Sequence, residues 1–174
     1  IGSGGFGWTS QLPAKDYQGT ARAKDLWALF ESQDTKALAP ELFDEFVLQY
    51  QKPVMERFGL VCYGCCEPMS ERWHLLKNIP NIRRVSVSPT CDRAKMAAEL
   101  QDKYVYSCRP NPAILSAGTF DEAAARKDIR DILEKAKGCP LEIIMKDHDT
   151  IHDDPSRAVA WCKIAKEEIG RYYK

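Results

Sequence analysis

The residues best suited to chemistry lie in the segment 62–68, where two thiols and a carboxylate are adjacent: Cys65, Cys66 and Glu67. This segment begins in a short apolar run, residues 60–63, that is typical of a buried strand. Parallel α/β folds place their sites at the carboxyl ends of strands. Because thiolates and carboxylates bind zinc, we expect Cys65 and Glu67 to face a pocket and hold a catalytic metal.

Polar residues also follow the later apolar runs. Arg109 and Asn111 come after the third predicted strand, and His148 comes after the fourth. A guanidinium binds a carboxylate through two hydrogen bonds, so we expect Arg109 to anchor an anionic group that Asn111 helps to orient. His148 is a candidate third metal ligand, and the alternative places both charged residues on a solvated surface. Weaker candidates for the wall of the pocket are Trp8, Gln33 and Tyr63.

The segment 2–7 matches the letters of the dinucleotide-binding pattern, with glycines at the required spacing. That pattern binds a pyrophosphate only when a strand precedes it and a helix begins directly after it. A single residue precedes this segment, and the residues that follow do not begin a helix. We therefore interpret it as a loop whose backbone approaches a ligand.

The elements that must position these residues alternate regularly along the chain. A helix is predicted over residues 40–58, with one apolar face formed by Phe43, Phe46, Val47, Tyr50, Val54 and Phe58. Four strand–helix units follow, with strands at 60–63, 83–88, 104–107 and 141–145 and helices at 70–78, 92–102, 119–136 and 154–172. Residues 1–39 are predicted to be loop-rich, with a helix around 22–30. Strands that alternate with helices are parallel and joined by right-handed crossovers.

Two architectures of this α/β class fit the pattern. A complete eight-stranded barrel needs about 250 residues, so this chain would be the C-terminal half of a (β/α)8 TIM barrel. The alternative is a small open doubly wound sheet, which would be complete at this length. We expect residues 1–174 to form a single domain, and the lack of an initial Met favours a fragment of a longer chain.

Composition narrows the class of protein. The 25 basic and 25 acidic residues balance, which argues against a nucleic-acid-binding protein because such proteins need a basic surface. No apolar run approaches the roughly 18 residues of a membrane span, so no membrane segment is expected. Seven cysteines, an odd number with two adjacent, indicate reduced thiols and a cytoplasmic protein rather than a disulfide framework.

Four segments carry a resemblance to a known family: residues 31–35, 40–50, 63–68 and 109–113. Over about residues 31–172 the chain resembles the uroporphyrinogen decarboxylase superfamily, which includes corrinoid-dependent methyltransferases. The resemblance implies a (β/α)8 barrel of which this chain is the C-terminal half. In the methyltransferases, a His-x-Cys pair after one strand and a Cys after the last strand bind zinc. Here Cys65 matches, Tyr63 replaces the histidine, and no cysteine stands in residues 146–149, directly after the last strand.

We infer that Glu67 and His148 substitute for the missing zinc ligands. The parent protein is then expected to move a methyl group between a small methylated substrate and a corrinoid held by a partner protein. The rival enzyme is a lyase, a decarboxylase of a tetrapyrrole or another carboxylated substrate, that leaves the cysteines inert. A third interpretation is an inactive half barrel that self-associates, as a homodimer, through its exposed strand edges.

Overall fold

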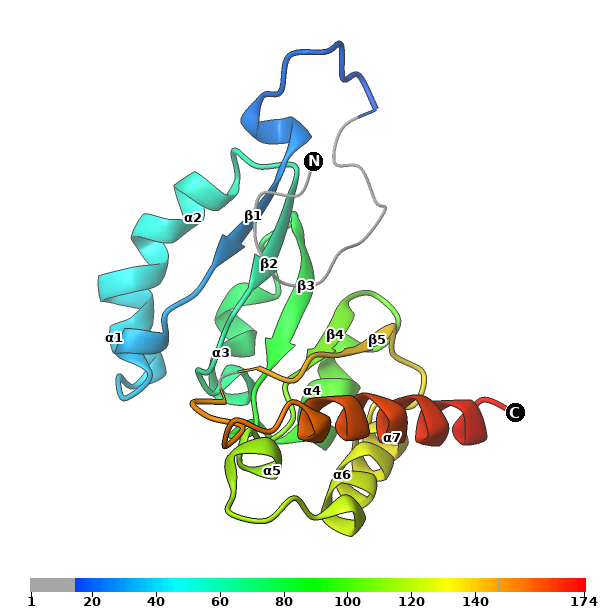
Figure 1. Cartoon of the computed structure of the whole chain (residues 1–174). Helices are drawn as coiled ribbons and strands as arrows, with labels where there is room; N and C mark the ends of the chain where they lie inside the picture. The colour runs from blue at the N-terminus through cyan, green and yellow to red at the C-terminus, as the bar shows by residue number, and fades with distance from the viewer. Residues whose placement is uncertain (1–14, 147) are drawn as a thin grey trace.

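A computed structural model describes residues 15–146 and 148–174, so the segment 2–7 and Trp8 lie outside the described residues. Five parallel strands form one sheet in the order β1-β2-β3-β4-β5 (Figure 1). Their bounds are Trp27–Phe30 (β1), Leu60–Tyr63 (β2), Ile82–Val87 (β3), Val105–Cys108 (β4) and Leu141–Ile143 (β5). The last four strands confirm the predicted alternation, and the structure is an α/β fold.

Helices connect the strands. Between β1 and β2 lie α1 (Pro40–Phe43), a π-helical segment (Asp44–Leu48) and α2 (Gln49–Met55). The others are α3 (Met69–Leu76), α4 (Arg93–Leu100), α5 (Ala113–Ser116), α6 (Glu122–Lys135) and α7 (Ser156–Tyr172). The Asp92 carboxylate accepts a hydrogen bond from the Lys95 amide at 3.0 Å, which fixes the start of α4. None of the described helices has the length and apolar character needed to cross a membrane.

The prediction of a helix around residues 22–30 was wrong. Only Ala23–Asp25 is helical, as a single 3₁₀ turn, and Trp27–Phe30 forms the strand β1. A four-residue apolar run has the same pattern in a strand and in a helical turn, so periodicity cannot separate them. Pairing decides the conformation here, because β1 aligns Trp27 with Leu60 and Phe30 with Tyr63 across the sheet.

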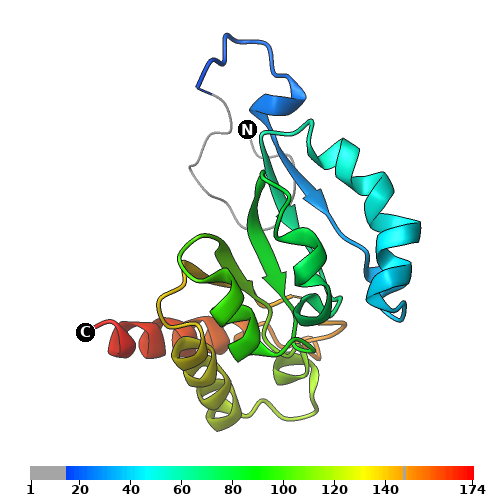
Figure 2. The same ribbon diagram turned by 180° about the vertical axis from the view of Figure 1, so that it is seen from behind.

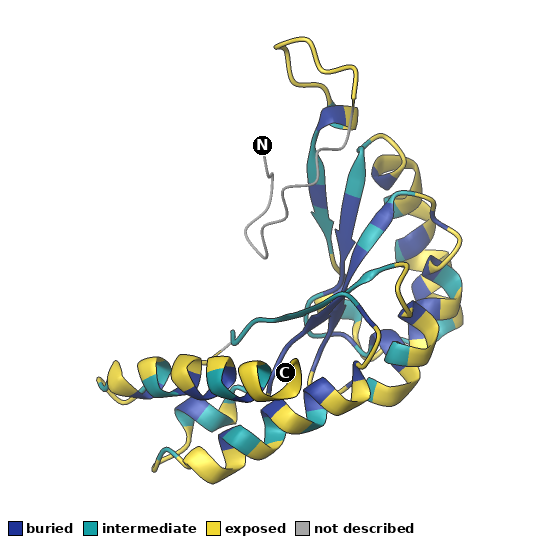
Figure 3. Ribbon diagram, turned by 90° about the vertical axis from the view of Figure 1, so that its right-hand side faces the viewer, coloured by how far each residue is buried: buried dark blue, intermediate teal, exposed yellow. Residues whose placement is uncertain are grey.

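Strands follow one another across the sheet in chain order. A doubly wound sheet reverses its strand order at a switch point, and the described sheet has no such reversal. Figure 3 shows the helices α1–α4 along the convex side of the curved sheet, with no described helix on the concave side. From behind, α3 and α4 lie in front of the strands (Figure 2). We call the concave side the inner face.

The apolar face predicted for residues 40–58 is divided in two. Phe43, Leu48 and Met55 are buried against the sheet, whereas Phe46 and Tyr50 are exposed. The π-helical segment between α1 and α2 inserts extra backbone into one turn and rotates the later residues relative to the earlier ones. Regular helical periodicity therefore placed three of the six predicted side chains, Phe46, Tyr50 and Val54, on the wrong face.

Candidate functional site

Arg84 is the centre of a polar layer on the inner face. Its guanidinium is 2% exposed and forms an ion pair with Glu142 of β5. It also donates to Ser107 Oγ of β4 at 3.3 Å and to Cys62 Sγ of β2 at 3.6 Å. One side chain on β3 thus contacts three other strands of the sheet. Buried charge requires such partners, because an uncompensated charge in the interior is costly.

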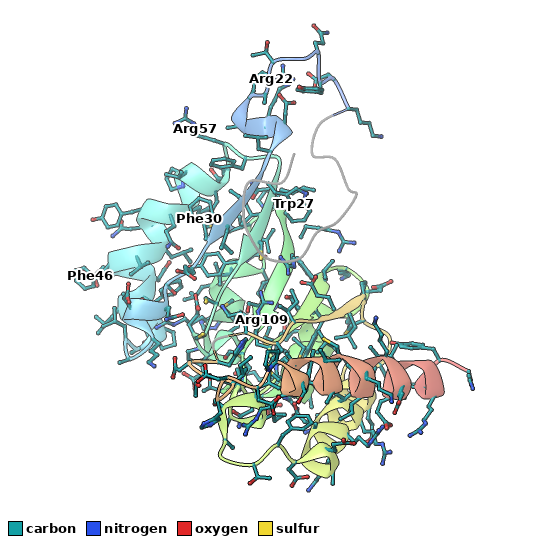
Figure 4. All side chains as sticks on the ribbon, in the orientation of Figure 1. Arg22, Trp27, Phe30, Phe46, Arg57 and Arg109 are labelled. Carbon is teal, nitrogen blue, oxygen red and sulfur yellow. The ribbon has the colours of Figure 1, made fainter. Side chains whose placement is uncertain are left out.

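Arg109 lies beyond the end of β4, near the carboxyl ends of the strands (Figure 4). The side chain is 2% exposed, and its Nε donates to Ser86 Oγ at 3.2 Å. Ser86 Oγ in turn donates to the backbone carbonyl of Cys65 at 3.0 Å. Burial, and secondly the positive charge of Arg84, lower the pKa of Arg109. The surroundings of Arg109 therefore disfavour a further positive charge and favour an anion.

Glu67 connects the loops that follow β1 and β2. Its carboxylate is fully buried, and Oε1 accepts hydrogen bonds from Ser32 N at 2.7 Å and Ser32 Oγ at 3.2 Å. Oε2 accepts from Cys65 N at 2.7 Å. Arg72 Nη1 donates to the same Ser32 hydroxyl at 2.9 Å. Glu67 thereby holds two loops of the carboxyl edge together, with its charge stabilised by backbone and hydroxyl donors.

Cys65 and Lys146 meet at the rim of the inner face. Lys146 Nζ donates to Cys65 Sγ at 2.8 Å, and Cys66 Sγ lies 3.8 Å from Cys65 Sγ. The segment after β5, orange in Figure 1, runs across the carboxyl ends of the strands and so brings Lys146 to β2. Burial raises the pKa of the Cys65 thiol, and Lys146 offsets this only in part. Lys146 is therefore the hydrogen-bond donor of this pair, and Cys65 Sγ is the acceptor.

The predicted metal ligands do not fit a zinc site in this arrangement. Glu67 uses both carboxylate oxygens for internal hydrogen bonds, and Cys65 is already in contact with Lys146. His148 is exposed. Across residues 15–146 and 148–174, no group of three or more His, Cys, Asp and Glu side chains is placed to hold a metal ion. Zinc binding through Cys65, Glu67 and His148 remains a prediction from sequence that this geometry does not support.

The other predicted site residues occupy separate places. Tyr63 is fully buried on the helix-covered face, where its hydroxyl donates to Gln51 Oε1 at 2.6 Å. Asn111 is exposed, and its Oδ1 accepts from Ala113 N at 3.0 Å at the start of α5. Gln33 is exposed in a 3₁₀ turn after β1. Of the described candidates, the structure links Arg109, Cys65 and Glu67 into one network.

Sequence reasoning missed Arg84, Ser86 and Lys146. A signal for the first two was present, because Arg84 and Ser86 alternate with the apolar residues Val85 and Val87 within one strand. Side chains two apart in a strand share a face, so this pattern indicates a polar inner face. Lys146 had no comparable signal, since its partner Cys65 lies 81 residues earlier in the chain.

The network lies at the carboxyl edge of a parallel α/β sheet, which is the edge where parallel α/β folds bind ligands. Comparison with protein-family models and with curated proteins finds no match for the chain. The assignment of a function therefore depends on the arrangement of its own residues.

Proposed function

We propose that this chain provides five consecutive strands of a uroporphyrinogen decarboxylase-like (β/α)8-barrel enzyme that acts on a small carboxylated substrate. Two features support the barrel. The parallel strands follow in chain order, as they do around a barrel, and the helices α1–α4 cover the convex side. The inner face would then line the interior of the barrel, with Arg109 and Lys146 at its catalytic end.

The proposal of a carboxylated substrate rests on Arg109. It combines near-complete burial, a position at the carboxyl edge and a neighbouring positive charge on Arg84. Glu142 forms an ion pair with Arg84. An incoming carboxylate would interact favourably with Arg109 in this low-dielectric setting and would be oriented by the planar guanidinium.

Decarboxylation is the reaction that this arrangement supports best. Breaking the bond to the departing carbon dioxide leaves its electron pair on the substrate carbon, and that carbon must then take up a proton. Arg109 would hold a carboxylate of the substrate, and the rim cation Lys146 would stabilise the developing negative charge and supply the proton. Decarboxylation does not require Glu67 as a metal ligand. This agrees with the structure, in which both carboxylate oxygens of Glu67 accept internal hydrogen bonds.

Methyl transfer to a corrinoid on a partner protein is the second candidate. The observation that favours it is the pair of half-buried thiols at the rim, Cys65 and Cys66. Thiolates are the ligands that zinc prefers in such enzymes. It ranks second because the remaining donors needed for a metal are engaged elsewhere or exposed.

Carboxylate binding is tested on the full-length protein with succinate as the probe and its diamide, succinamide, as the uncharged control. We expect calorimetry to show succinate binding that weakens by about tenfold or more in Arg109→Gln, because a buried charge-assisted contact is lost. Arg57→Gln, which changes an exposed arginine, should bind as the wild type does. Equal binding by Arg109→Gln and the wild type would overturn the proposal.

Metal content separates the two reactions. The decarboxylase proposal predicts anaerobically purified protein without stoichiometric zinc and release of carbon dioxide from a carboxylated substrate without cobalamin. About one zinc per chain that disappears in Cys65→Ala would instead support methyl transfer.

A further inference from the structure

Cys65 and Cys66 are neighbours in the chain, and their sulfur atoms are neighbours in the fold. Sγ of Cys65 lies 3.8 Å from Sγ of Cys66, in the loop that follows β2. Both side chains are half-buried at the rim of the inner face, whereas Cys62 within the strand is buried. A small solute therefore reaches this pair of thiols more easily than it reaches the thiols of the core.

Lys146 favours Cys65 as the sulfur that reacts first. Its Nζ donates to Cys65 Sγ at 2.8 Å, a shorter contact than the 3.6 Å between Arg84 Nη1 and Cys62 Sγ. A cationic donor at this distance stabilises negative charge on the sulfur that attacks an electrophile. Because a lysine ammonium has no lone pair, Lys146 cannot attack an oxidised Cys65, and the thiol of Cys66 is the neighbouring nucleophile.

The backbone of Cys65 connects this pair of thiols to the proposed substrate site. Its carbonyl accepts a hydrogen bond from Ser86 Oγ at 3.0 Å, and Ser86 Oγ accepts one from Arg109 Nε at 3.2 Å. Its amide donates to Glu67 Oε2 at 2.7 Å. A disulfide bond is about 2 Å long, so its formation must draw the two sulfur atoms together and turn the backbone that makes these contacts.

We propose that hydrogen peroxide converts Cys65 and Cys66 into a reversible disulfide, and that this disulfide weakens substrate binding at Arg109. Cys65 Sγ attacks one peroxide oxygen, the O–O bond breaks, and the other oxygen leaves as water with the thiol proton, so that Cys65 becomes a sulfenic acid. Cys66 Sγ then attacks the Cys65 sulfur, the S–O bond breaks, and the hydroxyl group leaves as water with the proton of Cys66. Two thiols are oxidised to a disulfide, and one peroxide is reduced to two molecules of water.

The adjacency of the two cysteines makes this disulfide easy to reduce. Neighbouring Cα atoms are about 3.8 Å apart, less than the roughly 4.4 Å at which the usual range for disulfides begins. The bond therefore forms under strain, and strained disulfides at accessible positions are the labile ones that a cellular thiol reverses. The effect on substrate binding rests on the proposed function, whereas formation of the disulfide does not.

Mass spectrometry of the full-length protein tests the disulfide. The reduced protein is treated with hydrogen peroxide, denatured and alkylated; we expect Cys62 to carry the alkyl label, Cys65 and Cys66 to lack it, and a thiol reductant to restore both. Cys66→Ser should form no disulfide at Cys65, whereas Cys162→Ser, which changes the exposed thiol of α7, should behave as the wild type. Full labelling of Cys65 and Cys66 after peroxide, or a bond from Cys65 to Cys62 or Lys146 instead, would overturn the proposal.

Calorimetry with succinate tests the link to Arg109. Peroxide should weaken succinate binding by the wild type by about fivefold or more, because the Cys65 carbonyl no longer holds Ser86 in place, and the reductant should restore it. Succinate binding by Cys66→Ser should be the same before and after peroxide. A disulfide that leaves succinate binding unchanged would overturn the link. Reduced wild type that does not bind succinate would overturn the proposed function and the link that rests on it, while the mass measurement still decides the disulfide.

Discussion

Glu67, at the scale of single residues, shows why a residue type alone does not define a site. In the sequence it stands beside two thiols, in the pattern of a metal ligand. In the fold it is fully buried, and its oxygens accept three hydrogen bonds from Ser32 and Cys65. The two interpretations differ in what removal of the carboxylate would do, because a structural carboxylate contributes mainly to stability.

Substitution of Glu67 should therefore destabilise the fold. We expect Glu67→Ala to lower the free energy of unfolding by about 2–4 kcal/mol, because backbone and hydroxyl donors lose a buried charged acceptor. Urea denaturation measures this change. Glu71→Gln is the control, since Glu71 is exposed on α3 and should change stability by less than about 0.5 kcal/mol. A Glu67→Ala protein as stable as that control would contradict the structural role.

At the scale of elements, α6 and α7 are joined by a carboxylate surrounded by arginines. Glu168 of α7 is 3% exposed at its side chain and lies 2.9 Å from Arg126, 2.7 Å from Arg130 and 2.9 Å from Arg171. Hydrogen bonds from Arg130, with further help from the other arginines, lower the pKa of Glu168 to about 2. An ordinary glutamate titrates at 4.5, so the folded chain holds this proton less tightly than the unfolded chain does.

This difference predicts how stability depends on pH. The stabilisation from Glu168 is complete above the unfolded pKa and is lost as the pH falls from about 5 towards about 2. Urea unfolding at pH 6 and at pH 3 should show a larger loss of stability for the wild type than for Glu168→Gln, which has no proton to gain. Glu122→Gln, at an exposed position on α6, should behave as the wild type. Equal losses in wild type and Glu168→Gln would contradict the pairing.

At the scale of the whole molecule, folding hides most of the thiols. Cys62, Cys91, Cys108 and Cys139 are buried, Cys65 and Cys66 are half-buried, and Cys162 is exposed. Burial raises the pKa of Cys108 to about 12, so this side chain stays a neutral thiol in the folded protein. The nucleophile in thiol labelling is the thiolate, and both burial and protonation therefore slow the reaction.

The rate of thiol labelling measures how accessible each cysteine is in the folded protein. With a disulfide reagent at neutral pH, Cys162 should react first and Cys65 and Cys66 more slowly, while the four buried thiols should react only after urea is added. Cys162→Ser should remove the fastest phase and leave the later phases unchanged. Rapid reaction of all seven thiols without denaturant would show that the core is not packed as described.

The prediction from sequence succeeded where a structural signal is local. The strand at residues 60–63 has the predicted bounds, and Asp92 begins α4 as its side chain indicates. It failed at β1, which is defined by pairing with β2, and at the segment from α1 to α2, where a π-helical turn shifts the register. Both failures arise because tertiary contacts, rather than local preferences, select the conformation.

The sequence by itself determined the alternation of strands and helices, because hydrophobic periodicity and caps act over a few neighbouring residues. It also placed Cys65, Glu67 and Arg109 near strand ends. Only the tertiary structure decided what these residues touch: Glu67 meets Ser32, 35 residues away, and Cys65 meets Lys146, 81 residues away. Such contacts depend on how the whole sheet brings distant loops together, and no local pattern of residue types encodes them.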